Sequence, residues 1–225
     1  MELIQDNWQQ LLNGVGLTLG LTLLGFAGAL IIGTLLAICR VSPIAPLRVA
    51  ATIYVEFFRN IPLLSLLMLV VFGLPDIGVM LPLFWCGVIS LLLSSSAFVC
   101  EAVRSGINTI SIGQSEAARA LGLSFWQQLR LIILPQALAK MVQPLINVFI
   151  GTLLGSSLCA AVGVTEITNV TQQLNIQYAQ AVFLFLLSGA VYLIFALGIG
   201  GLGARLERKL NSATRAGRRA EAVSH

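Results

Sequence analysis

The sequence predicts an all-α integral membrane protein with five transmembrane helices. Of its 225 residues, 57% are hydrophobic and only 10% are charged. That charged share is about half of what an ordinary soluble domain contains. Crossing about 30 Å of hydrocarbon takes a helix of about 20 apolar residues, and helices or closed barrels are the only backbones that span a bilayer. Five runs qualify: residues 11–39, 53–75, 77–100, 141–165 and 179–204.

The five runs differ in charge. The first follows a polar, acidic N-terminus that lacks the basic start of a cleavable signal peptide, so we expect it to remain as a membrane anchor. The second is apolar apart from Glu56 and Arg59, and the other three are uncharged. Pro62, Pro82 and Pro144 are expected to kink or bound their helices.

Four glycines suggest where the helices pack closely. Gly16 and Gly20 lie four residues apart in the first run, and Gly151 and Gly155 repeat this spacing in the fourth. Because small residues at this spacing let two backbones approach, we expect helix contacts at these positions.

The distribution of lysine and arginine predicts the orientation. These residues follow the first, third and fifth runs, and none occurs in the N-terminus, around Asp76 or in residues 165–178. Positively charged loops stay in the cytoplasm. We therefore expect the N-terminus outside, the C-terminus in the cytoplasm and the loop at residues 105–140 in the cytoplasm. Residues 1–210 would form a single transmembrane domain, and residues 211–225 a loosely ordered basic cytoplasmic tail beside membrane lipid, with no support for a nucleic-acid partner.

The sequence of the cytoplasmic loop predicts two short helices joined by a sharp turn, which we call the corner. Ser115 is expected at the N-cap of the first helix and Glu116 in its first turn, where the helix dipole favours an anion. Gly122 would supply the left-handed residue that ends this helix. Ser124 and Gln127 have the spacing of a capping box at the start of the second helix.

The same loop resembles a known motif. Seven positions carry the likeness: Glu116, Ala117, Ala118, Gly122, Ile132, Leu134 and Pro135. Their order is similar to the EAA loop of membrane subunits of ABC importers, in which the loop forms the coupling helix that docks into the ATP-binding subunit. The resemblance implies a type I ABC importer-like fold, in which the first four of these residues act in ATPase coupling through the 115–122 helix. Pro135 is expected to end or kink the second helix.

Three further stretches resemble the polar amino acid branch of ABC importer permeases. They are Leu12-Asn13-Gly14 with Thr18 and Thr22, residues 54–64, and residues 101–107 with Gly113 and Gln114. With the loop, the likeness covers roughly residues 11–210. It implies a permease subunit of the bacterial inner membrane. Its partners would be two ATP-binding cassette subunits, a second permease subunit in a homodimer or heterodimer, and an extracytoplasmic amino acid-binding protein.

No residue pattern in the chain indicates an ATPase site or a catalytic centre. The chain lacks a G-x-x-x-x-G-K phosphate loop, and its only histidine is His225. No nucleophile lies beside a base, and the four cysteines lack zinc-site spacing. We expect no catalytic residue, no metal site and no cofactor in this chain, which is therefore not an enzyme; ATP and Mg would be bound by the partner subunits.

Charged side chains in the apolar runs are candidates for a substrate pathway. A charge at the centre of a membrane helix costs about 2.5–3.5 kcal/mol on insertion scales, so Arg59 needs a reason to be there. Either Arg59 pairs with Glu56 and anchors a helix end, or Arg59 and Asn60 line the pathway and Arg59 meets a substrate carboxylate. Glu101 and Arg104 present the same choice, and there we expect them to brace the loop.

Two hydroxyl clusters are further candidates: Ser94 and Ser95 in the third run, and Ser156 and Ser157 in the fourth. They either bond to their own backbone or offer donors and acceptors to a zwitterion. Related permeases commonly carry Lys and then Asp or Asn where this chain has Leu154 and Gly155, which removes polar groups from that part of a pocket.

The expected substrate is an acidic amino acid, glutamate or aspartate. Arg59, the lack of carboxylates in the third to fifth runs, and a likeness of residues 99–104 to glutamate/aspartate-type members favour it. The alternative is an ion-coupled secondary transporter or channel subunit, which would need a buried acidic ion site and inverted repeats.

Overall fold

A computed structural model describes the backbone of residues 2–223 and the side chains of residues 3–210, except those of residues 112, 115, 135 and 139. Its helices are α1 Glu2–Asp6, α2 Trp8–Val41, α3 Ala45–Asn60, α4 Leu63–Met68, the π-helix η1 Leu69–Gly73, α5 Leu74–Asp76, α6 Leu83–Asn108, α7 Ile112–Ala120, α8 Phe125–Gln128, the π-helix η2 Leu129–Ile133, α9 Leu134–Ser156, the 3₁₀ helix η3 Ser157–Val162, α10 Ile167–Tyr178 and α11 Ala181–Val223. The described residues contain no strand, so the all-α prediction is confirmed.

Four stretches are long and apolar enough to cross a membrane: Trp8–Val41, Leu83–Asn108, Lys140–Val162 and Ala181–Leu210. A fifth crossing is possible through the pair Ala45–Asn60 and Leu63–Asp76, which is bent by 102°. The predicted second span is therefore two helices. Ile61 has an extended backbone, because the residue before a proline is disfavoured in the helical region, and Pro62 is the N-cap of the next helix.

Two other boundaries differ from the sequence prediction. The third span begins at Leu83, after an irregular segment at residues 79–82, and not at residue 77. Helix α11 continues to Val223, so the expected loose tail is helical that far, whereas residues 224 and 225 lie outside the described residues. The tail sequence is rich in alanine and arginine and contains no proline, which favours a helix.

The core is built on close packing of α2 against α6. A Cβ atom added at Gly33 would lie 2.5 Å from the Ser96 carbonyl oxygen, so only glycine fits there. Another close approach joins Gly106 to Met141 on α9. The expectation for Gly16 and Gly151 is wrong, because nothing lies within 4 Å of a Cβ at either position.

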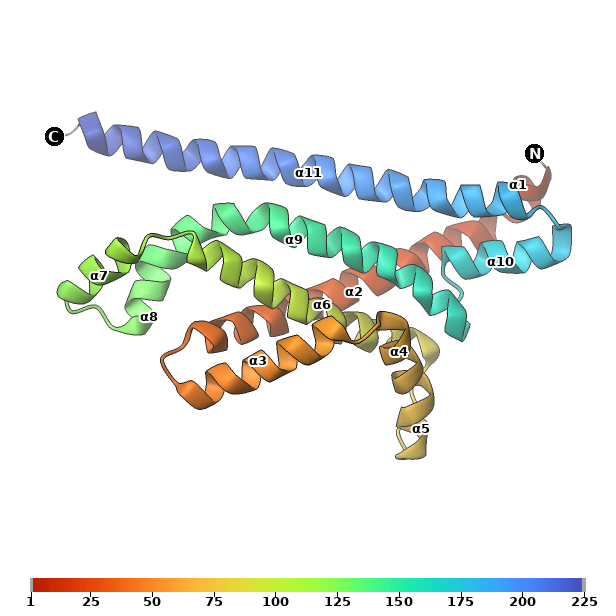
Figure 1. Cartoon of the computed structure of the whole chain (residues 1–225). Coiled ribbons are helices and arrows are strands. Elements are labelled where there is room, and N and C mark those ends of the chain that lie inside the picture. Colours follow the sequence, from red (N-terminus) through yellow and green to blue (C-terminus); the bar gives the residue numbers. More distant parts are fainter. Residues whose placement is uncertain (1, 224–225) are drawn as a thin grey trace.

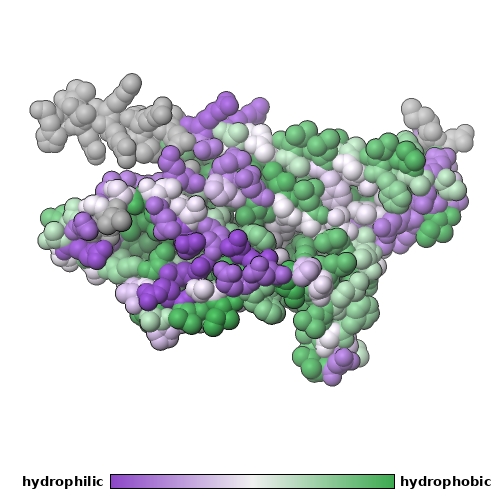
Figure 2. Space-filling model, in the orientation of Figure 1, coloured by the Kyte–Doolittle hydropathy of each residue, from purple (hydrophilic) through white to green (hydrophobic). Residues whose placement is uncertain are grey.

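The long helices run side by side, and their connections form two distinct ends (Figure 1). Helices α7 and α8 lie at the end reached by the C-terminal part of α11, whereas α10 and the N-terminus lie at the other. Figure 2 shows hydrophilic residues around α7 and around α10, and hydrophobic residues over much of the rest of this face apart from a hydrophilic patch near its middle. This distribution suits a bundle whose middle lies in hydrocarbon and whose ends lie in water.

Candidate functional site

The corner between α7 and α8 has a defined backbone. Gly122 has φ of +77°, its N–H donates to the Arg119 carbonyl at 2.9 Å, and the Leu123 N–H donates to the Ala118 carbonyl at 3.1 Å. This pair of bonds is the Schellman ending of a helix, which requires a left-handed residue. The capping box is also present, since the Ser124 N–H donates to Gln127 Oε1 at 2.8 Å and the Gln127 N–H to Ser124 Oγ at 3.4 Å. Both local predictions are confirmed.

The start of α7 differs from the prediction. Ser111 occupies the N-cap position with an extended backbone, so Ser115 lies inside the helix and Glu116 in its middle. Ser111 is a residue type favoured at this position, although its side chain makes no capping hydrogen bond, and the helix gains length by starting there. Glu116 and Ala117 are exposed, whereas Ala118 is buried.

The exposed tip of the corner is apolar. Leu121 is 80% exposed and Trp126 is 62% exposed, beside the charged residues Glu116 and Arg119. Sequence reasoning missed Leu121 and Trp126, although large apolar residues beside the glycine of a polar loop are a usable signal of a contact surface.

The return from the corner to the bundle is helical throughout. The π-helix η2 lies between α8 and α9, and Pro135 falls in the first turn of α9. The wider turn of the π-helix changes the pattern of backbone hydrogen bonds before Pro135, so fewer of them are lost through the missing N–H of proline. Pro135 therefore does not end the helix, so of the two predicted effects, an end or a kink, the first is wrong. The same arrangement precedes Pro75, where η1 leads into α5.

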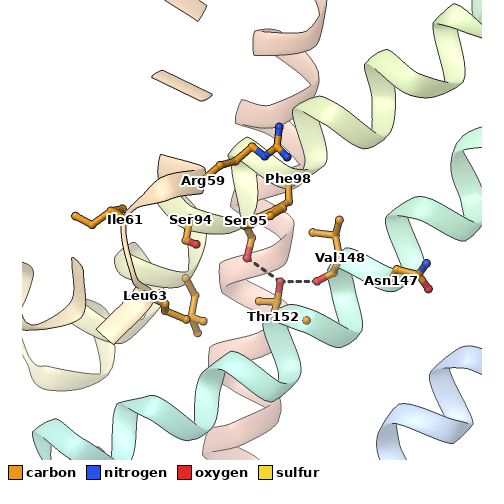
Figure 3. A pocket seen from close by; sticks show the side chains of 11 residues that line it. Arg59, Ile61, Leu63, Ser94, Ser95, Phe98, Asn147, Val148 and Thr152 are labelled. Carbon is orange, nitrogen blue, oxygen red and sulfur yellow. Dashed lines mark hydrogen bonds between the residues drawn. The ribbon is translucent and has the colours of Figure 1, made fainter. Parts of the chain in front are cut away.

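A pocket of about 490 Å³ opens between the α3–α4 bend, α6 and α9. Its lining residues are Arg59, Ile61, Leu63, Leu91, Ser94, Ser95, Phe98, Asn147, Val148, Gly151 and Thr152 (Figure 3). Figure 2 shows a hydrophilic patch over the C-terminal end of α3, in the middle of the visible face. The volume lies in the range of small-molecule sites.

Three of the six predicted pathway residues line this pocket: Arg59, Ser94 and Ser95. The other three do not. Asn60 donates to the Glu56 carbonyl at 2.7 Å, and Ser156 and Ser157 donate to backbone carbonyls one turn back, each at 2.6 Å. Backbone bonding of this kind is the ordinary fate of serine in a membrane helix.

The pocket contains both satisfied and unsatisfied polar groups. Ser95 Oγ and Thr152 Oγ1 lie 2.8 Å apart, and Thr152 donates to the Val148 carbonyl at 2.9 Å (Figure 3). The Ser94 hydroxyl and the Asn147 amide nitrogen have no hydrogen-bond partner among the described residues. Sequence reasoning missed Asn147 and Thr152, which single polar residues in an apolar run would have identified as candidates.

A charged cluster lies beside the pocket, around Glu101. Arg104 donates to Glu101 Oε2 from Nη2 at 2.7 Å, Arg59 Nη1 lies 3.4 Å from Oε1, and Arg40 also bonds Oε1. Three guanidinium groups facing one carboxylate leave a formal excess of two positive charges. Arg59 thus pairs with Glu101 and not with Glu56, which was one of the two alternatives left open for it. Glu101 and Arg104 both lie on α6, and Glu101 joins this helix to α2 through Arg40 and to α3 through Arg59. Any bracing of the loop would act through these helices.

A second polar cluster escaped the sequence analysis. Glu166 is fully buried at the N-cap of α10, where it accepts bonds from the Asn169 N–H at 2.9 Å, Tyr192 Oη at 2.6 Å and Thr18 Oγ1 at 3.3 Å. These bonds join α10 to α2 and α11. The sequence placed Glu166 in a polar connection, and only tertiary packing reveals its burial.

Comparison with known proteins places the chain in a family. Residues 29–212 match the family described as "Binding-protein-dependent transport system inner membrane component". The chain belongs to this family. It is accordingly a multi-pass inner-membrane protein, and the family relationship makes it the permease subunit of an ABC transporter.

Relatives of this permease transport different amino acids, according to their names. It is 32% identical to the "Probable glutamine ABC transporter permease protein GlnM" of Bacillus subtilis (strain 168), over 92% of this chain and 98% of that protein. It is 32% identical to the "Arginine transport system permease protein ArtQ" of the same organism (90% and 93%), and 35% identical to the "Glutamate transport system permease protein GluC" of Corynebacterium glutamicum (90% and 95%).

The fold of the permease agrees with a solved relative. The "Crystal structure of an amino acid ABC transporter with histidines" matches with a TM-score of 0.85 at 30% identity, covering 92% of this chain and 96% of that chain. The predicted type I ABC importer-like fold is thereby confirmed.

Proposed function

We propose that this permease imports a polar amino acid and that ATP hydrolysis in separate subunits drives the movement. The observation that carries the proposal is the pocket at the α3–α4 bend, whose mostly apolar lining also contains the Arg59 guanidinium, the unpaired Ser94 hydroxyl, the Asn147 amide and the Ser95–Thr152 hydroxyl pair. A zwitterion needs one group for its carboxylate and others for its ammonium and side chain. The names of the relatives support an amino acid as the substrate class.

The charge of the pocket favours an acidic side chain. Arg59 is the only ionisable residue in the lining, and the neighbouring cluster adds further positive charge. A guanidinium binds a carboxylate through charge-assisted bonds, whereas a cationic side chain would meet no counter-charge there. We therefore propose glutamate or aspartate as the cargo, with Arg59 on a carboxylate and Ser94 and Asn147 on the remaining polar groups.

The α7–α8 corner is the proposed point of ATPase coupling. Glu116, Ala117, Ala118 and Gly122 would dock into one of two ATP-binding cassette subunits, which bind ATP and Mg. The exposed Leu121 and Trp126 add apolar area to this contact. The corner would lie in the cytoplasm, as its positive charge favours, and a binding protein would dock at the α10 end, outside. A second permease subunit, identical or different, completes the complex, which moves as rigid bodies between inward-open and outward-open states.

An ion-coupled transporter would need a buried acidic residue that is available to bind the ion, and the buried acidic residue Glu166 does not meet this need. Glu166 is fully buried, but its carboxylate already accepts three hydrogen bonds from Asn169, Tyr192 and Thr18. An ion site needs oxygens that are available as ligands.

The substrate proposal is tested by uptake of a panel of labelled amino acids into vesicles that contain the assembled transporter. We expect uptake of glutamate or aspartate, and Arg59→Gln should raise KM at least about tenfold, because a charge-assisted bond contributes about 1.5–3 kcal/mol. Arg48→Gln is the matched control, because Arg48 is an exposed arginine of the same helix that does not line the pocket. Equal KM values in both variants, or uptake of cationic amino acids only, would contradict the proposed role of Arg59.

A further inference from the structure

We infer that Arg59 is paired with Glu101 while the pocket is empty, and that Arg59 leaves Glu101 to bind the carboxylate of the incoming amino acid. Glu101 thereby acts as a positioning residue that sets the affinity of the pocket for carboxylates. The inference rests on the proposed function, and it assigns a specificity role to a residue that does not line the pocket.

The present partner of Arg59 and the lining of the pocket lie along one face of α6. Ser94, Phe98 and Glu101 are spaced i, i+4 and i+7, so they follow one another on the same helix face. The Arg59 guanidinium carbon lies 5.8 Å from the Phe98 ring centroid, and Arg59 Nη1 lies 3.4 Å from Glu101 Oε1. The pocket opens on the Ser94 side of Phe98 (Figure 3). By changing its rotamer, Arg59 can therefore exchange Glu101, on one side of the Phe98 ring, for a carboxylate in the pocket, on the other side.

Of the three arginines that contact Glu101, Arg59 is the easiest to release. Its contact with Glu101 is longer than the 2.7 Å bond from Arg104. Its side chain is 40% exposed, whereas that of Arg40 is 13% exposed. When Arg59 leaves, Glu101 keeps two guanidinium partners, so no buried carboxylate is left unpaired.

The exchange replaces one carboxylate by another and needs no proton transfer. The cluster has an excess of positive charge, so adding an anionic group to Arg59 lowers the electrostatic energy of the site. Glu101 therefore competes with the substrate. Weakening Glu101 should tighten substrate binding, whereas strengthening its hold on Arg59 should loosen it.

Three variants of the assembled transporter test this competition. Glu101→Gln should tighten binding of the transported amino acid about three- to fivefold, as expected for a partly exposed ion pair. Arg104→Gln removes a rival for Glu101 and should weaken binding by a similar factor. Combining Glu101→Gln with Arg59→Gln should abolish the gain, because the competition acts through Arg59. Binding is measured by calorimetry on purified complex in nanodiscs, with L-glutamate and L-aspartate as probes.

The outcomes separate this inference from its alternatives. A purely structural cluster would give weaker binding in both single variants, and a general field effect would preserve the gain without Arg59; either result overturns the inference. If Glu101→Gln does not fold, Glu101→Asp retains the charge but shortens the side chain, and should also tighten binding. Uptake of an amino acid with no change in these variants would overturn the inference alone. A complex that transports no amino acid would overturn the proposed function as well.

Discussion

Replacing Gly122 by alanine should uncouple the permease from its ATPase while leaving the fold intact. Gly122 has φ of +77°, and nothing lies within 4 Å of a Cβ built there. The cost is therefore backbone strain alone, about 1–2 kcal/mol for an L-residue in the left-handed region. This shifts the balance between the observed corner and other loop shapes by a factor of about 5–30. Gly122→Asn should retain more function, because asparagine enters this region more readily.

The matched control is Gly113→Ala in the same loop. Gly113 also has open space around it, but it lies inside α7 without a positive φ, so alanine there should favour the helix by about 1 kcal/mol. The assay is co-purification of the ATP-binding subunit together with ATP-driven uptake. We expect both to fall for Gly122→Ala and to be unchanged for Gly113→Ala. Wild-type coupling in Gly122→Ala, or equal losses in the two variants, would refute the reasoning.

Two stability predictions concern the core. Gly33→Ala should lower the free energy of unfolding by at least about 1–3 kcal/mol, since its Cβ would lie 2.5 Å from the Ser96 carbonyl oxygen, whereas Gly16→Ala, in open space, should not destabilise the bundle. Glu166→Ala should cost about 3 kcal/mol or more by leaving its buried donors unpaired, whereas Glu56→Ala, at an exposed carboxylate, should stay within about 0.5 kcal/mol. Thermal unfolding in detergent measures both pairs, and equal effects within either pair would contradict the packing described.

Local chemistry was readable from the sequence where a few adjacent residues decide the structure. The left-handed conformation of Gly122 and the capping box of Ser124 depend only on neighbours in the chain, and both were predicted. The N-cap was misplaced because Ser111 and Ser115 are the same residue type, and the helix begins after the earlier one without a side-chain capping bond.

Tertiary contacts were not readable in the same way. Ser95 and Ser157 look alike in an apolar run, but Ser95 bonds to Thr152 of another helix and Ser157 bonds to a backbone carbonyl one turn back. The sequence left either Glu56 or a substrate in the pathway as the partner of Arg59, whereas packing of α3 on α6 brings it to Glu101. A single sequence does not contain the rotation of one helix against another, which decides such partners.

The central claim is that ATP hydrolysed by partner subunits moves an amino acid through this permease. The most direct measurement is accumulation of labelled glutamate or aspartate in vesicles carrying the whole transporter, with ATP supplied on the side of the α7–α8 corner and a protonophore present. We predict accumulation that requires ATP and persists when the proton gradient is collapsed. Accumulation without ATP that disappears with the protonophore would contradict the account.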